Sequence, residues 1–261
     1  MGNLTTVSNY TQVIPESAGG AGDTGYGQNI AVTEDFMAIS AIRYDALGLE
    51  NSGCVYLYEL DIDGIPIESS LQVITPSDLQ PGDLFGDPVK IVDDYLITAS
   101  FTKGSGQIYI YDLSNELSET IISSPSSTPD ERFGCSFDLS EDKQYLFVGA
   151  LGSDSSTSSS GAVYCYSLSD SGYELYTVLE SPRPIPDAGF GRYVEVTSDQ
   201  LIVGSQNSST VFVFDIATLT LDDVIGVGLP RAIDGLGVPI DVYDDVMVLV
   251  PATASGALVA H

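Results

Sequence analysis

The chain has 261 residues, of which 43% are apolar and 17% charged, enough apolar material for a substantial core. Acidic residues outnumber basic ones 37 to 8, and the net charge of −29 would repel a nucleic-acid backbone or an anionic membrane surface. The single histidine is His261, so this sequence cannot supply a histidine-based catalytic triad or a multi-histidine metal site. We therefore expect no nucleic-acid partner and no membrane insertion.

Processing and redox signals are sparse. Cys54, Cys135 and Cys165 lack the paired spacing of a zinc site or a disulfide framework. Residues 1–15 contain neither a basic start nor an apolar run, so no signal peptide is visible, and no segment approaches the ~18 apolar residues of a membrane span. The compartment stays unknown from these signals, with an extracellular surface or a virion favoured.

In chain order, a strand-like segment at residues 3–14 is followed by five similar units. Each unit opens with a Gly preceded by an aromatic residue or Leu, then predicts a tight β-hairpin, a third strand rich in aromatic and β-branched residues, and a weaker fourth strand. The fifth unit stops before its own fourth strand. The repeat glycines are Gly27, Gly86, Gly134, Gly191 and Gly237, and the units span about residues 23–75, 83–123, 130–180, 187–226 and 234–261.

The segment 3–14 has no unit of its own and can supply the strand that the fifth unit lacks. The pattern therefore predicts an all-β fold, a five-bladed β-propeller with four-stranded blades, in which the N-terminal strand completes the last blade. Closure of this kind removes the sheet edges on which a linear array of hairpins would aggregate. We expect one domain over residues 1–261.

The third unit carries the clearest family signature, with Phe133-Gly134 at its first strand, Gly149-Ala150 after its second and Gly161-Ala162 before its third. At these residues the chain resembles the FG-GAP repeat family, which includes the integrin α-subunit head domains. The resemblance implies a propeller that contacts partners through one face and often binds calcium between the first and second strands. That loop is too short here for the six to eight oxygen ligands of calcium, so we expect the calcium site to be missing. The metal content stays unknown; we expect no cofactor, with weak divalent cation binding left open.

An aspartate precedes every repeat glycine by three or four positions. On a propeller these residues would lie on one face, where a ring of carboxylates around the axis could hold a cation or select cationic groups. The alternative, which the recurrence favours, is that each side chain caps backbone N–H groups of its own turn. The repeat glycines need no ligand, because close strand approach or a positive φ explains them. The candidate ring is Asp23, Asp83, Asp130, Asp187 and Asp234.

Two further features could carry binding. Tyrosines alternate along the third strands and could stack on sugars, although packing between blades explains their repetition better. The loop at residues 42–52 is longer than most of its equivalents, and its residues Arg43, Tyr44 and Asp45 form a candidate partner site, because rigid scaffolds usually carry function on irregular connections. The tyrosines are Tyr56, Tyr58, Tyr109, Tyr111, Tyr164 and Tyr166.

Two functions remain open at this point. The first is a noncatalytic protein-interaction or structural module that presents loops to a protein partner or assembly, as a surface, adhesion or virion component. It rests on the uninterrupted repeat, the variable loops and the missing catalytic residue set, and it implies that the chain is not an enzyme. The alternative is a glycan-binding or glycan-processing propeller whose channel-mouth carboxylates work as acid and base. The sequence favours the first.

Overall fold

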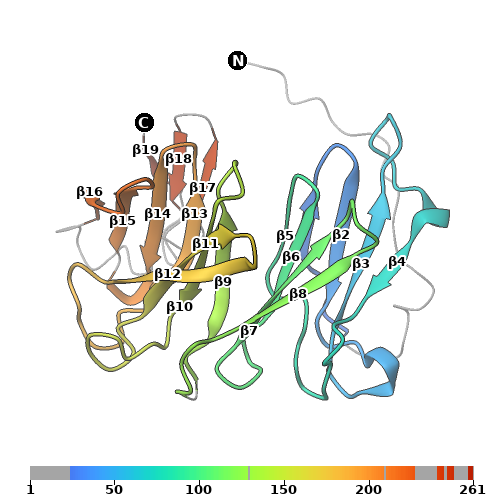
Figure 1. Cartoon of the computed structure of the whole chain (residues 1–261), viewed down its shortest axis with the longest axis horizontal. Helices are drawn as coiled ribbons and strands as arrows, with labels where there is room; N and C mark the ends of the chain where they lie inside the picture. The colour runs from blue at the N-terminus through green and yellow to red at the C-terminus, as the bar shows by residue number, and fades with distance from the viewer. Residues whose placement is uncertain are drawn as a thin grey trace.

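The computed structural model describes residues 24–128, 130–208 and 210–226, together with the backbone of residues 240–243, 246–249 and 258–260. It is an all-β fold of four four-stranded antiparallel sheets and one three-stranded sheet, which follow one another in chain order (Figure 1). Within the described part of the chain, no helix has the length and apolar character needed to cross a membrane.

Each complete sheet pairs its four strands in the order in which they occur. Sheet 1 contains β1 (Tyr26–Val32), β2 (Phe36–Ala41), β3 (Cys54–Glu59) and β4 (Gln72–Ile74). Sheet 2 contains β5 (Val89–Val92), β6 (Tyr95–Ser100), β7 (Gln107–Asp112) and β8 (Ser118–Ser123). Sheet 3 contains β9 (Phe133–Leu139), β10 (Tyr145–Ala150), β11 (Ala162–Ser169) and β12 (Gly172–Glu180).

Sheet 4 contains β13 (Phe190–Val196), β14 (Gln200–Ser205), β15 (Thr210–Asp215) and β16 (Leu221–Ile225). Sheet 5 contains β17 (Ile240–Tyr243), β18 (Val246–Leu249) and β19 (Leu258–Ala260). Within the described residues, three short 3-10 helices lie in the connections, at Ala46–Gly48, Glu68–Ser70 and Gln206–Ser208.

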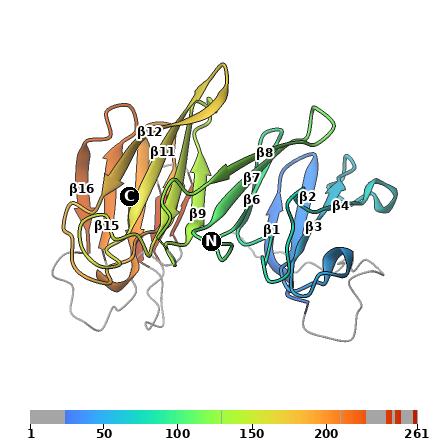
Figure 2. The ribbon, with the colours of Figure 1, turned by 60° about the horizontal axis from the view of Figure 1, so that its bottom comes forward.

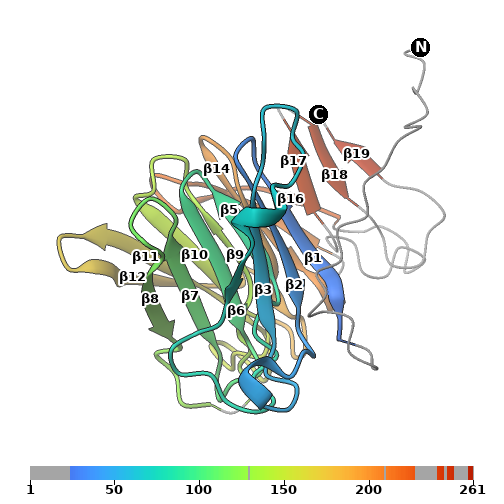
Figure 3. The ribbon, with the colours of Figure 1, turned by 90° about the vertical axis from the view of Figure 1, so that its right-hand side faces the viewer.

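The first strand of each sheet is the inner one. Strand β1 lies against β5, β9 against β13, and β13 against β17. The fourth strands β4 and β16 lie toward the outside of the arrangement (Figure 2). From the side, the strands run steeply and the connecting loops gather at two opposite ends (Figure 3). The fold therefore has two loop-bearing faces, as a propeller does.

An apolar core fills each of the three junctions between neighbouring sheets from sheet 1 to sheet 4. Leu57 of sheet 1 packs with Leu96 of sheet 2, and Ile97 on the other side of sheet 2 packs with Leu146 of sheet 3. Another cluster joins sheets 3 and 4. Because side chains alternate across a strand, sheets 2 and 3 each contribute to two cores, one on each side. The apolar second and third strands supply side chains to both.

The aromatic residue of the repeat motif packs against the aromatic pair on the third strand of its own sheet. The Phe85 ring lies edge-on to Tyr109 at 5.2 Å and to Tyr111 at 6.3 Å between centroids, and both tyrosines are buried. Phe133 and Phe190 make the same contacts in sheets 3 and 4. The third-strand tyrosines thus serve packing, as the sequence favoured.

A second set of glycines fixes the distance between sheets. Phe133 N donates to Ser105 O at 2.9 Å, and a Cβ added to Gly106 would lie 1.9 Å from Phe133 O. The equivalent contacts recur between Gly53 and Phe85 and between Gly161 and Phe190. Only glycine permits backbone to meet backbone this closely, which explains why these residues open the third strands.

The predicted four-stranded units are present in sheets 1 to 4. Sheet 5 has three strands within the described residues, and the predicted closing strand at residues 3–14 lies outside them. The count of five four-stranded blades, the closure and the single domain over residues 1–261 therefore stay predictions.

Candidate functional site

The two faces of the fold carry different connections. One face, here called the entry face, holds the loops that lead into each first strand and those that join second to third strands. The opposite face, here called the hairpin face, holds the turns between first and second strands and between third and fourth strands. All five aspartates of the predicted ring precede a first strand, so those that are described lie on the entry face.

The structure divides the predicted ring into two sets. Asp83, three positions before its repeat glycine, is 4% exposed, and Glu131 occupies the same position before sheet 3 at 1% exposed. Asp130 and Asp187, four positions before theirs, are exposed. Asp23 and Asp234 lie outside the described residues. One residue of offset therefore separates buried from exposed carboxylates.

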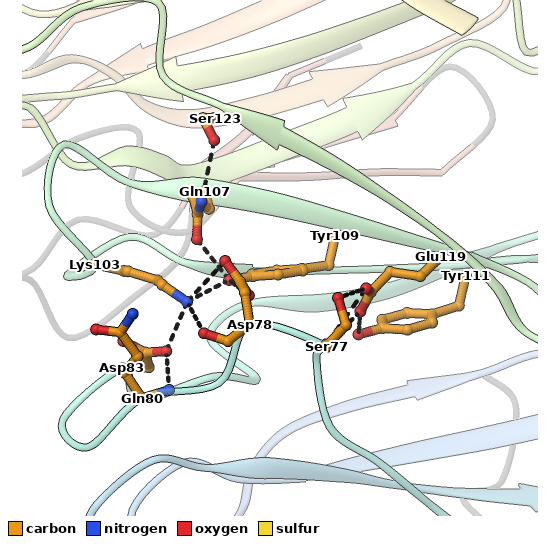
Figure 4. Close-up of polar contacts among 10 residues, drawn as sticks. All are labelled: Ser77, Asp78, Gln80, Asp83, Lys103, Gln107, Tyr109, Tyr111, Glu119 and Ser123. Atoms are coloured by element: carbon orange, nitrogen blue, oxygen red, sulfur yellow. Dashed lines mark hydrogen bonds and ion pairs between the residues drawn. The ribbon is translucent and has the colours of Figure 1, made fainter.

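The buried carboxylates have structural partners. Asp83 Oδ2 lies 2.9 Å from Lys103 Nζ and accepts a hydrogen bond from Gln80 N (Figure 4). The same ammonium group lies 3.0 Å from Asp78 Oδ2. Glu131 instead accepts hydrogen bonds from Tyr164 Oη and a serine hydroxyl. Asp83 therefore caps a backbone N–H group of its own turn, as the capping alternative predicts, whereas Glu131, among the described residues, binds side-chain hydroxyl groups only.

The exposed pair occupies a special backbone conformation. Asp130 has φ 62° and Asp187 has φ 57°, and the same position before sheet 2 is Gly82 with φ 80°. Aspartate tolerates this left-handed region better than most residues, which accounts for its recurrence. Among the contacts of the described residues, neither carboxylate accepts a hydrogen bond or joins an ion pair.

Asp130 and Asp187 line one cavity of about 370 Å³ between sheets 3 and 4. Arg132 and Asn207 line it as well, so two acidic residues, one basic residue and one amide residue border the same space. The remaining lining residues are Leu151, Gly152, Ser159 and Gly189. Cavities with a few convergent polar groups are the usual place for binding and catalysis.

The walls of this cavity are held by backbone contacts. Asn207 Nδ2 donates to Asp187 O at 2.6 Å, and Asp187 N donates to Ser158 O at 3.0 Å. A Cβ on Gly152 would lie 2.1 Å from Asp130 O, so a glycine is required where this loop meets the next turn. The backbone of the two loops that carry Asp130 and Asp187 is therefore held in place by the fold.

The other predicted residues lie apart from this cavity. Arg43 and Asp45 are exposed, Asp45 Oδ1 accepts a hydrogen bond from Asn51 N at 2.8 Å, and the Tyr44 ring packs edge-on to Tyr56 at 6.5 Å. None of the three lines the cavity. Their loop closes on itself, and a partner for it stays a prediction.

The repeat glycines serve the backbone. Four have φ between 80° and 110°, a region that favours glycine, and the fifth, Gly237, lies outside the described residues. The four are Gly27, Gly86, Gly134 and Gly191.

Sequence reasoning missed an ionic cluster on the inner strands. Lys90 Nζ lies 3.1 Å from Asp138 Oδ2 and 2.9 Å from Glu195 Oε2, and Asp138 also accepts a hydrogen bond from Val196 N. Burial lowers the pKa of Lys90, but the two carboxylates outweigh burial and hold that pKa above its usual value. All three residues stand four positions after a repeat glycine, a regularity that aligning the units on that glycine could have revealed.

Metal and thiol chemistry have no evident place among the described residues. They contain no group of three or more His, Cys, Asp or Glu side chains that could hold a metal ion. All three cysteines are free and buried. Burial raises the pKa of Cys54 to about 11 and that of Cys165 to about 12, so these thiols stay protonated and unreactive at neutral pH.

Comparison with known proteins gives structural neighbours only. No family model matches the chain, and no curated protein sequence does. A periplasmic gluconolactonase from Pseudomonas aeruginosa superposes with a TM-score of 0.58 at 16% identity, covering 85% of this chain and 64% of that one. Virginiamycin B lyase from Staphylococcus aureus gives a TM-score of 0.60 at 12% identity, covering 91% of this chain and 67% of that one. The chain thus spans about two thirds of each neighbour, and the likeness supports a propeller-like fold.

These findings correct several expectations. The FG-GAP resemblance finds no family match, and the adhesion, virion and structural roles find no support. The expected noncatalytic interaction module is contradicted, because both neighbours are enzymes by name. That expectation rested on the uninterrupted repeat, the variable loops and the missing catalytic residue set. Acid–base catalysis by carboxylates, however, needs no histidine. At these identities the likeness establishes the fold alone.

Proposed function

We propose that this chain is a hydrolase that acts on a neutral, sugar-derived substrate in the cavity between sheets 3 and 4. The observation that carries the proposal is that Asp130, Asp187 and Arg132 line one cavity without forming an ion pair among the described residues. The enzymatic neighbours of similar fold support a catalytic use of such a site.

The charge of the chain restricts the substrate. With a net charge of −29, the surface repels anions over a Debye length, so a neutral substrate approaches more readily than an anionic one. A polyhydroxylated molecule suits the lining, because its hydroxyl groups donate to the carboxylates and accept from Arg132 and Asn207. This proposal develops the glycan-binding or glycan-processing alternative from the sequence analysis and assigns it to a specific cavity.

Arg132 indicates which bond is cleaved. In ester or lactone hydrolysis, one carboxylate takes a proton from water, the water oxygen attacks the carbonyl carbon, and the carbonyl oxygen becomes negative before the ester C–O bond breaks and the leaving oxygen takes up a proton. A guanidinium group stabilises that negative oxygen. In glycoside cleavage the sugar becomes positively charged, and the same group opposes it. We therefore favour a sugar lactone or sugar ester, with glycan cleavage as the second candidate.

We also propose that the fold is a closed five-bladed propeller forming one domain, with residues 3–14 as the fourth strand of sheet 5. Its support is that β17, β18 and β19 pair in the order of the first three strands of every complete sheet. Deleting residues 1–14 should then lower the denaturant midpoint clearly, because a blade edge becomes exposed. An unchanged midpoint would contradict closure by this segment.

The catalytic proposal is tested by assaying the full chain on a neutral six-carbon sugar lactone, acetylated neutral sugars and aryl glycosides. We expect turnover of the lactone or the esters. Asp130→Asn and Asp187→Asn should separate the general base, whose loss lowers kcat by about 10²-fold or more, from the carboxylate that orients the substrate, whose loss raises KM. Arg132→Gln should lower kcat by about 10²-fold.

The matched control is Asp222→Asn, which removes the same charge from an exposed site on β16 and should leave turnover unchanged. Cleavage of the aryl glycosides alone would establish the second candidate instead. An equal loss in the control variant, or no turnover of any of the three substrate classes, would refute the proposal.

A further inference from the structure

A second cavity, of about 300 Å³, lies on the hairpin face between sheets 1 and 2. Four apolar side chains line it, and three polar side chains accompany them. Its position follows from its residues, which come from the ends of strands and from the turn between β7 and β8. The apolar residues are Phe36, Leu57, Leu113 and Leu117, and the polar ones are Glu59, Gln72 and Glu116.

The charge in this cavity is uncompensated. Glu59 and Glu116 are exposed carboxylates, and neither joins an ion pair among the described residues. The lysines of the chain are already engaged: Lys90 with Asp138 and Glu195, Lys103 with Asp78 and Asp83, and Lys143 with Asp93 and Asp94. The lining itself contains no basic residue. The cavity therefore presents negative charge beside an apolar surface.

Hydrogen bonds hold the turn between β7 and β8, which carries Glu116. Leu117 N donates to Asp112 O at 3.0 Å, and Asp112 Oδ1 accepts from Ser114 N at 2.9 Å. Glu116 and Leu117 both adopt left-handed backbone, with φ 51° and 57°. On the other side, Leu57 is 2% exposed and belongs to the core between sheets 1 and 2. The backbone of the turn that carries Glu116 is thus fixed beside the buried apolar part of the lining.

We infer that this cavity binds a small organic cation, namely a primary ammonium group on an apolar body. The ammonium group would pair with Glu59 and Glu116, and the apolar body would take the place of water against the leucines and Phe36. Phe36 adds an aromatic side chain, to which cations are attracted. The volume lies at the small end of ligand sites. A bare or hydrated metal ion fits poorly, because hard cations need several oxygen ligands and gain nothing from the leucines.

The test is isothermal titration of the full chain with 2-phenylethylammonium, 2-phenylethanol and 3-phenylpropionate as probes. We expect saturable binding of the ammonium compound, about 10-fold weaker binding of the alcohol, and still weaker binding of the carboxylate. The double variant Glu59→Gln/Glu116→Gln should bind the ammonium compound about 10-fold more weakly.

The matched control is Glu141→Gln/Asp222→Asn, which removes two exposed charges elsewhere and should bind like the unaltered chain. Equal weakening in the control would show nonspecific attraction to an acidic protein and overturn the proposal. Equal binding of the alcohol and the ammonium compound would also overturn it, since the carboxylates would then contribute nothing. Catalysis at the cavity between sheets 3 and 4 is unaffected by either result, because the two cavities share no residue.

Discussion

The loop that enters sheet 2 and the loops that enter sheets 3 and 4 have similar sequences, but their aspartates lie in opposite environments. Before sheet 2, Asp83 is buried and paired with Lys103. Before sheets 3 and 4, Asp130 and Asp187 are exposed and line a cavity. The difference is one position relative to the repeat glycine. Because adjacent residues point in different directions, an offset of one residue moves a carboxylate from the interior to the surface.

This contrast shows how a repeated fold acquires a site. The position three before the glycine points inward and needs a partner, which Lys103 supplies for Asp83 and Tyr164 for Glu131. The position four before it needs only a left-handed backbone, so its side chain is not committed to the fold. Function can therefore be placed at the second position at little cost in stability.

The largest expected effect comes from Lys103→Met. The substitution leaves the buried Asp83 carboxylate, with only 6% of its side chain exposed, without its cation, and we expect a loss of about 3 kcal/mol in the free energy of unfolding. Asp130→Asn and Asp187→Asn should stay within about 0.5 kcal/mol of the unaltered chain. Urea unfolding of the three variants measures the difference.

The double variant Lys103→Met/Asp83→Asn serves as the control for the first prediction. Removing both charges should recover part of the loss, because no uncompensated carboxylate remains buried. If Lys103→Met unfolds at the same urea concentration as the unaltered chain, the two loops do not differ in the way proposed.

A smaller effect is expected at the left-handed position itself. Asp187 has φ 57°, and Gly82 holds the equivalent position before sheet 2. Asp187→Gly should therefore leave stability nearly unchanged, whereas Asp187→Val should cost roughly 1–2 kcal/mol because a β-branched residue is strained in this conformation. Both variants remove the carboxylate and should impair the proposed hydrolysis to the same extent, through kcat or through KM. Equal stability of the two variants would show that the conformation imposes no constraint.

The sequence predicted the sheets well, because aromatic-Gly motifs, hairpin patterns and third-strand tyrosines are local signals repeated in phase. It did not separate Asp83 from Asp130, since counting three or four positions as equivalent merged two registers. Arg132 is one of only eight basic residues in the sequence, but only the meeting of neighbouring loops reveals that it shares a cavity with Asp187. Asn207 gave no catalytic signal at all. Contacts between loops of different sheets depend on packing that no local pattern encodes.

The smallest loss of stability at neutral pH is expected for a substitution in the network around Lys103, and this substitution also tests the effect of alkaline pH. Tyr109 is buried, and its hydroxyl donates to Gln107 Oε1 at 2.7 Å beside Asp78 and Lys103 (Figure 4). Burial, followed by the Asp78 charge, raises the pKa of Tyr109 above its usual value of 10.0. Above pH 10 the unfolded chain loses this proton while the folded chain keeps it. The contribution of this group to the free energy of unfolding is therefore constant below pH 10. Above that pH the free energy of unfolding falls by about 1.4 kcal/mol per pH unit for each such group.

Burial also raises the pKa of Tyr111, Tyr164 and Tyr166, so the whole fold should unfold steeply in alkali. Tyr109→Phe should lower the free energy of unfolding by about 1 kcal/mol at neutral pH, because its hydrogen bonds are lost. Above pH 10, however, its free energy of unfolding should fall less steeply with pH, because one buried tyrosine fewer is present. Urea midpoints measured from pH 8 to 11 test both effects. The exposed Tyr176→Phe is the matched control and should leave the decline unchanged, because its hydroxyl is in water in either state. If the urea midpoint of Tyr109→Phe falls with pH as steeply as that of the unaltered chain, Tyr109 loses its proton equally readily in the folded and unfolded states. The network of Tyr109, Lys103 and Asp83 would then lack the buried character that distinguishes it from the exposed Asp130 and Asp187.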